Sequence, residues 1–115
     1  MPNPVTHFEI LGRDGKKLQS FYADVFGWKV DANNPMDYGI VEPQEGHGTG
    51  GGIGQAEKPA VMIYVEVDDP QAYLDKAVAK GGKVAMPVSD LGMVVIAQFQ
   101  DPEGNVIGLA KAAQH

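Results

Sequence analysis

The sequence contains no cysteine, few basic residues and no long apolar run, and each shortage excludes classes of protein. Without cysteine there is no disulfide framework, no thiolate nucleophile and no cysteine-based zinc site. Nine basic residues stand against fifteen acidic ones, and the net charge of −6 disfavours binding to nucleic acid or to an anionic membrane surface. No window is apolar enough to span a bilayer, and the Met-Pro-Asn-Pro start does not resemble a signal peptide. We therefore expect a cytoplasmic protein.

The chain of 115 residues is long enough to bury a core as a single domain. The sequence of its first half predicts a strand, a helix and three further strands. Residues 4–11 alternate between apolar and polar side chains, as in a half-buried strand. Asp14 is placed to cap a helix that ends at Gly27, and strands are expected at 28–30, at 36–41 and, poorly specified, in the glycine-rich run 48–54. The apolar stripe of this helix consists of Leu18, Phe21, Tyr22, Val25 and Phe26.

The second half repeats this order. A strand at 61–67 is followed by Asp69 and Pro70, which are typical of a helix start, and Gly81-Gly82 is expected to end that helix. Three more strands are predicted at 83–86, 93–99 and 105–110, with a strong turn signal before the last of them.

Two pairs of landmarks relate the halves to each other. Asp14 and Asp69 are 55 residues apart, and so are Gly27 and Gly82. A repeat of this length indicates one structural unit used twice. We therefore predict an α+β fold, a single domain over 1–115 in which two βαβββ modules (about 1–56 and 57–115) form a curved, mostly antiparallel sheet with two outer helices and a concave pocket. The alternative is an unrelated α+β domain with coincidental spacing.

A series of short segments extends along almost the whole chain: His7-Phe8-Glu9-Ile10, Asp14 with Phe21-Tyr22, Phe26-Gly27-Trp28, Gly51-Gly52-Ile53, Val65-Glu66-Val67-Asp68-Asp69, Gly81-Gly82-Lys83-Val84 and Asp101-Pro102-Glu103-Gly104-Asn105. In this order and spacing they resemble the vicinal oxygen chelate superfamily of glyoxalases, bleomycin-resistance proteins and ring-cleaving dioxygenases. The pattern is most similar to short glyoxalase-like proteins related to lactoylglutathione lyase. The resemblance implies a small-molecule ligand and a homodimer.

Metal-using members of that superfamily hold a divalent ion with four side chains, two from each half. The resemblance places the first ligand on His7, the third on Met62, the fourth on Gly108 and the second near 50–54, where there is no carboxylate. A methionine thioether is too soft for Mg²⁺, Mn²⁺ or Fe²⁺, and glycine offers only its backbone. We therefore expect no cofactor, and a divalent metal only if it is held through His7.

Strand alternation predicts which side chains share the face of the pocket. If His7 faces it, so does Glu9, whereas the apolar residues between and after them face the helix layer. On the equivalent strand the pocket side receives Met62, Tyr64 and Glu66. Residues Tyr38 and Gln98 are expected to join them. The predicted ligand-binding residues are therefore His7, Tyr38, Met62, Tyr64, Glu66 and Gln98.

His7 and Glu9 are the candidate catalytic residues. An unperturbed histidine titrates near pH ~6.5, and residues two apart on a strand lie about 7 Å from each other, so that a substrate or water could bridge them. Such a pair could abstract a proton beside a carbonyl or act on an epoxide. The alternative is that both are polar pocket or surface residues inherited from the framework.

Two other features are weaker candidates. His47 lies in a flexible stretch and is expected to be solvated. The glycine run 50–54 has neither a Walker-type nor a Rossmann-type phosphate pattern. We expect it to mark a close backbone approach at the junction of the halves, or a flexible pocket rim.

Three functions follow, in order of preference. The first is binding of a small apolar or aromatic metabolite without a metal, with a drug-sequestering resistance protein as a special case. The second is an enzyme, either metal-free through His7 and Glu9 or a metal-dependent lyase, isomerase or dioxygenase with an unconventional site. The third is a protein whose sheet edge or concave face binds another protein, which a large exposed apolar patch would favour.

Overall fold

The structure is a computed structural model that describes residues 2–43 and 47–112, and the chain divides into two compact units. One unit is Thr6–Met62, and the other is the chain from Ile63 onward together with the residues that precede Thr6. We call them the first and the second module, and we count the whole of β5 (Ala60–Glu66), which includes the boundary between the units, with the second. Those early residues belong to it because the Glu66 N–H donates to the Pro4 carbonyl at 2.9 Å.

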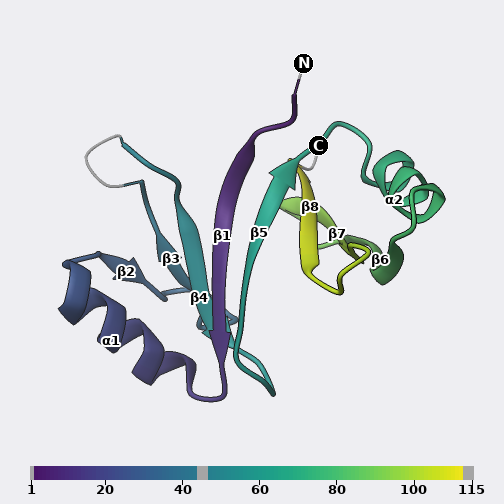
Figure 1. Ribbon diagram of the computed structural model, residues 1–115. Helices are drawn as coiled ribbons and strands as arrows, with labels where there is room; N and C mark the ends of the chain where they lie inside the picture. Colours follow the sequence, from purple (N-terminus) through teal and green to yellow (C-terminus); the bar gives the residue numbers. More distant parts are fainter. Residues whose placement is uncertain (1, 44–46, 113–115) are drawn as a thin grey trace. The chain divides into compact units, whose positions relative to one another are not determined.

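The first module has four strands in the order β2-β3-β4-β1, with α1 along one face (Figure 1). β1 and β4 pair in parallel, whereas β2–β3 and β3–β4 are antiparallel. The helix contacts β4. Its elements are β1 (Val5–Gly12), α1 (Gly15–Phe26), β2 (Val30–Asp31), β3 (Gly39–Val41) and β4 (Gly51–Gln55).

The second module repeats this arrangement with the strand order β5-β8-β7-β6 and α2 packed on β7, β6 and β8. Its first and last strands are again the parallel pair, and the other pairings are antiparallel. The prediction of an α+β fold built from two βαβββ modules with mostly antiparallel strands is therefore confirmed. Its elements are β5 (Ala60–Glu66), α2 (Pro70–Ala79), β6 (Lys83–Asp90), β7 (Val94–Gln100) and β8 (Val106–Ala112).

Both helices begin at the predicted aspartates. The Asp14 carboxylate accepts a hydrogen bond from the Lys17 N–H at 3.1 Å, and the Asp69 carboxylate accepts one from the Ala72 N–H at 3.2 Å. Each cap satisfies a backbone donor that the first turn leaves without an intrahelical partner. Neither α1 nor α2 is long and apolar enough to cross a membrane.

The helix ends differ from the prediction in one respect. Gly27 ends α1 in the left-handed conformation, at φ 73°, as expected. After α2 the left-handed glycine is Gly81, at φ 105°, so the predicted pairing of Gly27 with Gly82 is wrong by one residue. Gly82 is required for another reason: a Cβ there would lie 2.6 Å from the Gln100 carbonyl oxygen.

The two modules bury their helices differently. The second has an apolar core in which Leu74 of α2 packs with Val67, Ala97 and Leu109. In α1 the buried residues are Gly15 and Gln19, whereas the predicted apolar stripe is largely exposed, with Phe21, Val25 and Phe26 each more than half accessible. The prediction of the helix was correct, but only Leu18 and Tyr22 of its stripe lie on the partly buried side.

Candidate functional site

Glycines in β4 allow two aromatic rings to lie against the strand from opposite faces. A Cβ on Gly51 would be 2.4 Å from the Phe8 ring, and a Cβ on Gly52 would be 1.9 Å from the Tyr38 ring. Neighbouring residues of a strand point to opposite faces, so Phe8 lies on one side and Tyr38 on the other. The glycine run therefore marks a place where aromatic side chains lie close to the backbone within the first module. The sequence had suggested a close approach of backbones at the junction of the halves.

The backbone of Tyr38 is fixed on both sides, although it lies in the loop before β3. The Asn34 side chain accepts from the Tyr38 N–H at 3.0 Å and donates to the Tyr38 carbonyl at 2.7 Å. Gln19, buried in α1, donates through Nε2 to the carbonyl of Asp37 at 3.0 Å and to that of Ile53 at 2.9 Å. Asp37 has φ 53°, a left-handed conformation that aspartate tolerates better than most residues. The loop thus presents Tyr38 in a defined position.

The Tyr38 hydroxyl joins the two predicted catalytic residues. It donates to Glu9 Oε2 at 2.8 Å and lies 2.9 Å from His7 Nε2. A hydroxyl has one proton, so when Tyr38 donates to Glu9 the other hydrogen bond runs from His7 Nε2–H to the phenol oxygen. The histidine and the glutamate lie on the same face of β1, as predicted. The phenol bridges the distance that separates them along the strand.

Partial burial moves the pKa values of both ionisable residues. Desolvation lowers the pKa of His7 below its ordinary 6.5, because the charged imidazolium loses water. Desolvation also raises the pKa of Glu9 above 4.5, and this effect outweighs the hydrogen bond from Tyr38, which lowers it. His7 is therefore harder to protonate than an exposed histidine. Glu9 becomes a stronger base than an exposed glutamate.

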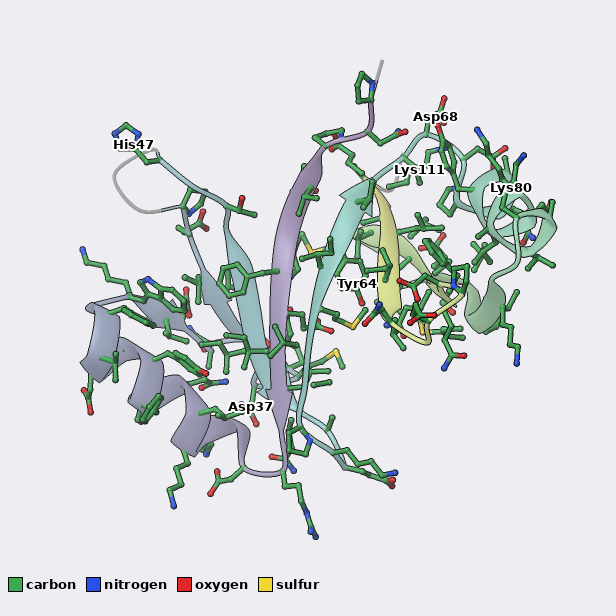
Figure 2. The ribbon with its side chains drawn as sticks, viewed as in Figure 1. Asp37, His47, Tyr64, Asp68, Lys80 and Lys111 are labelled. Carbon is green, nitrogen blue, oxygen red and sulfur yellow. The ribbon has the colours of Figure 1, made fainter. Side chains whose placement is uncertain are left out.

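The equivalent positions of the second module, 55 residues further on, are Met62 and Tyr64. The Tyr64 ring lies over Gly108, where a Cβ would be 2.3 Å from it, and Tyr64 is paired with Gly108 as Glu9 is with Gly52. Gln98 donates through Nε2 to the Tyr64 hydroxyl at 3.1 Å. Figure 2 shows Tyr64 on β5. A tyrosine thus covers the glycine in both modules, from the loop before β3 in one and from the first strand in the other.

The remaining predicted site residues have different environments. Met62 and Tyr64 are buried, whereas Glu66 is exposed and its carbonyl accepts from the Asn3 side chain at 3.1 Å. Ile63, between the buried Met62 and Tyr64, points to the other face of β5 and is 38% exposed, whereas Val65 on that face packs against the core of the second module.

Two cavities lie apart from the His7–Tyr38–Glu9 cluster. One, of about 270 Å³, is lined by residues of the first module that include Phe8, Trp28 and His47. Because Phe8 and His7 point to opposite faces of β1, this cavity and the cluster are on different sides of the strand. His47 itself is exposed, as expected, and Figure 2 shows it in the loop that precedes β4. The other cavity, in the second module, is described below.

The four-ligand metal site implied by the resemblance does not fit these residues. Tyr38 and Tyr64 occupy the space that a side chain on Gly52 or Gly108 would need, and the Met62 side chain is a buried thioether. Of the expected positions only His7 carries a ligand for a hard divalent ion. Within residues 2–43 and 47–112, no three His, Asp or Glu side chains are close enough to hold one.

The fold, the repeated module and the position of the cluster on the first strand define the class of protein. The model of the Glyoxalase/Bleomycin resistance protein/Dioxygenase superfamily matches residues 5–109, and the chain belongs to this superfamily. The resemblance seen in the sequence is therefore confirmed.

Two curated relatives illustrate the similarity. The protein of Mycobacterium bovis named "Putative glyoxylase CFP32" is 32% identical over 112 residues, which cover 89% of this chain and 43% of that protein. The chain thus spans less than half the length of this relative. A glyoxylase-like domain-containing protein of Didymella fabae is 29% identical over 114 residues and covers 88% of each chain.

Solved structures with the same fold include a methylmalonyl-CoA epimerase from Mycobacterium tuberculosis, with a TM-score of 0.70 and 15% identity over 96% of this chain and 88% of that one. A hypothetical protein from Bacillus halodurans has a TM-score of 0.70 and 13% identity, with 100% and 98% coverage. At these identities the similarity establishes the fold alone.

Proposed function

We propose that the chain binds a small apolar or aromatic metabolite on the sheet face that carries His7, Glu9 and Tyr38, and that it does so without the four-ligand metal site of its superfamily. The observation that carries the proposal is the position of Tyr38, whose ring fills the space of the missing side chain at Gly52 while its hydroxyl bonds to both His7 and Glu9. A phenol held in this way supplies an apolar ring surface and a polar tip in one place.

The metal part of the proposal is tested by elemental analysis after reconstitution with Mn²⁺, Ni²⁺, Zn²⁺ or Fe²⁺, together with thermal melts with and without each ion. We expect no stoichiometric metal and no shift of the melting temperature. Stoichiometric metal with a shift that His7→Ala abolishes would contradict the proposal and would support a metal-dependent lyase, isomerase or dioxygenase with an unconventional site.

The ligand part is tested by screening small aromatic and aliphatic metabolites and hydrophobic cationic drugs by thermal shift. The matched variants are Tyr38→Phe, which removes the phenol hydroxyl of the cluster, and Tyr22→Phe, which removes a phenol hydroxyl of α1 outside the predicted ligand-binding residues. We expect ligands to lose affinity in Tyr38→Phe and to keep it in Tyr22→Phe. Preferential binding of cationic drugs would indicate a drug-sequestering protein, which the net charge of −6 would suit.

A second candidate function is acid–base catalysis at a carbon beside a carbonyl. Two observations favour it: the continuous hydrogen bonds from His7 through Tyr38 to Glu9, and burial that raises the pKa of Glu9. In such a step the Glu9 carboxylate takes the proton, and the electron pair of the broken C–H bond moves into the carbonyl as an enolate. Return of a proton from Glu9 to that carbon regenerates the carboxylate and completes an exchange of the C–H hydrogen.

This chemistry is tested by NMR in D₂O with a ligand identified in the screen that carries a carbonyl. Catalysis would be supported if the protein accelerates exchange of the adjacent C–H hydrogen and a chelator does not stop it. The exchange should be lost in Glu9→Gln although that variant still binds the ligand. Binding without exchange would leave the chain as a binding protein.

The homodimer, the cytoplasmic location and the absence of nucleic-acid and membrane partners stay predictions. Light scattering on the purified chain measures the first. A monomer, or an oligomer larger than two copies, would contradict it.

A further inference from the structure

The second module contains a cavity between α2 and its sheet, which we call the α2 cavity. Its volume is about 310 Å³, at the lower end of the range of about 300–1,000 Å³ found for small-molecule sites. The sheet side is formed by Val65, Val67, Phe99 and Leu109, and the helix side by Tyr73 and Ala77. Val67 and Leu109 also belong to the core, so the cavity extends directly from it. A ligand entering it would meet an almost wholly apolar interior.

The rim of the cavity carries two positive charges. Lys76 lies in the last turn of α2 and Lys80 caps its C-terminal end, so the two are four residues apart on the same side of the helix, and both line the cavity. Figure 2 shows Lys80 at the end of this helix. Both side chains are exposed, and no ion pair is found for either among the residues that the structure describes. Their apolar stems can cover the cavity while the charged ends stay in water.

The acidic residue at the rim is already engaged elsewhere. Asp101 Oδ1 accepts from the backbone N–H groups of Glu103 and Asn105 at 2.9 Å each, and Oδ2 accepts from the Asn105 side chain at 2.8 Å. These bonds lower the pKa of Asp101 and fix its carboxylate in the turn before β8. Asp101 stays ionised, so its one negative charge and the two positive charges of Lys76 and Lys80 leave the rim with a net charge of 2 − 1 = +1.

We propose that the α2 cavity is a second binding site, which takes a small amphipathic carboxylate: an aliphatic or aromatic tail in the apolar interior and a carboxylate beside Lys76 and Lys80. The chemistry of the lining selects this ligand class. A polar anion such as phosphate gains nothing from the apolar interior, and an apolar cation is repelled at the rim. The site uses residues of the second module alone, so it does not depend on the function proposed for His7, Tyr38 and Glu9.

The test is calorimetric titration with three probes that share one tail: octanoate, octanol and octylammonium. We expect octanoate to bind and octylammonium to bind far more weakly than octanoate. Because exposed ion pairs contribute little each, the double variant Lys76→Gln/Lys80→Gln should weaken octanoate about tenfold. It should leave octanol unchanged. The matched control is Lys16→Gln/Lys17→Gln on α1, which should bind octanoate like the parent chain.

A second variant tests the interior. Ala77→Phe places a ring in the cavity and should abolish the binding of octanoate and octanol alike, whereas Ala79→Phe, at an exposed position of the same helix, should not. Amide chemical shifts of the parent chain with octanoate should change in α2, β7 and β8. Any one of three results would overturn the proposal. These are equal binding of the three probes, octanoate binding that survives Ala77→Phe, and chemical-shift changes confined to the first module. Tyr38→Phe should leave octanoate binding intact, which separates this site from the one proposed above.

Discussion

At equivalent places on their first strands, one module carries His7 and Glu9 and the other carries Met62 and Tyr64. The strand order, the parallel pairing of first and last strands, the capping aspartate and the glycine beneath a tyrosine ring recur in both. The side chains differ in kind: two half-buried ionisable groups face a phenol in one module, and a buried thioether and phenol pack in the other. Two copies of one scaffold can thus divide their roles, with titratable chemistry in the first and apolar packing in the second.

The sharpest way to break this comparison is to add a methyl group beneath each tyrosine. Gly52→Ala and Gly108→Ala force a Cβ into the Tyr38 and Tyr64 rings, and overpacking of this kind costs about 1–3 kcal/mol or more of the free energy of unfolding. Urea denaturation measures the loss. Tyr38→Ala should recover part of the stability in the Gly52→Ala background but not in Gly108→Ala. Additive effects of the two changes at Gly52 and Tyr38 would contradict the contact.

Removal of each phenol oxygen separates the chemical role from packing. Tyr38→Phe leaves His7 and Glu9 without their shared partner in a half-buried place, which should cost about 1–3 kcal/mol. Tyr64→Phe removes the bond from Gln98 and should cost about 1 kcal/mol. Thermal melts compare the two. A larger loss in Tyr64→Phe would place the stronger polar network in the second module.

The helix caps should behave alike in both modules. Asp14→Ala and Asp69→Ala each remove one bond to a backbone N–H, and each should lower the free energy of unfolding by about 1 kcal/mol. The corresponding Asn variants, whose side chains can still cap, should lose much less. If Asp69→Ala had no effect while Asp14→Ala did, the equivalence of the two helix starts would be wrong.

The smallest expected effect concerns the pH dependence of Glu9. Its pKa is raised in the folded chain, so between pH 4.5 and that raised value the folded state binds more protons than the unfolded state, and stability falls as the pH rises through this window. Glu9→Gln removes this cost and should raise the melting temperature slightly at pH 7 but not below pH 4.5. His7 changes the stability in the opposite direction, because its pKa is lowered in the folded state and stability is lost as the pH falls below 6.5. This contribution is present in the parent chain and in Glu9→Gln alike. A Glu9→Gln variant that is less stable at pH 7 would contradict the direction given for Glu9.

Much of the fold could be predicted from the sequence because its signals are local. Both capping aspartates, Gly27 and the alternation of side chains along β1 act over a few residues, and all are found in the structure. The burial of α1 could not be predicted in this way. Its apolar stripe suggested Phe21 and Val25 as core residues, but the buried polar residue is Gln19, which is placed by carbonyl groups far away in the chain.

The candidate site was predicted in part. His7 and Glu9 share a face of β1 because of strand alternation, whereas the hydrogen bonds that join them depend on Tyr38, about 30 residues further on. The glycines of β4 gave the only hint, since a missing side chain often admits a neighbouring group.

The glycine-rich strand β4 also has a consequence for the order of folding. Gly51, Gly52 and Gly54 give β4 little preference of its own for an extended conformation, and its parallel partner β1 precedes it by about 40 residues of chain. We therefore expect β4 to become ordered only after β1 and β3 are in place to receive it. In hydrogen exchange from the native state its amides should open at lower free energy than those of β7 and β8, so that the strand beneath Tyr38 exchanges before the central strands of the second module.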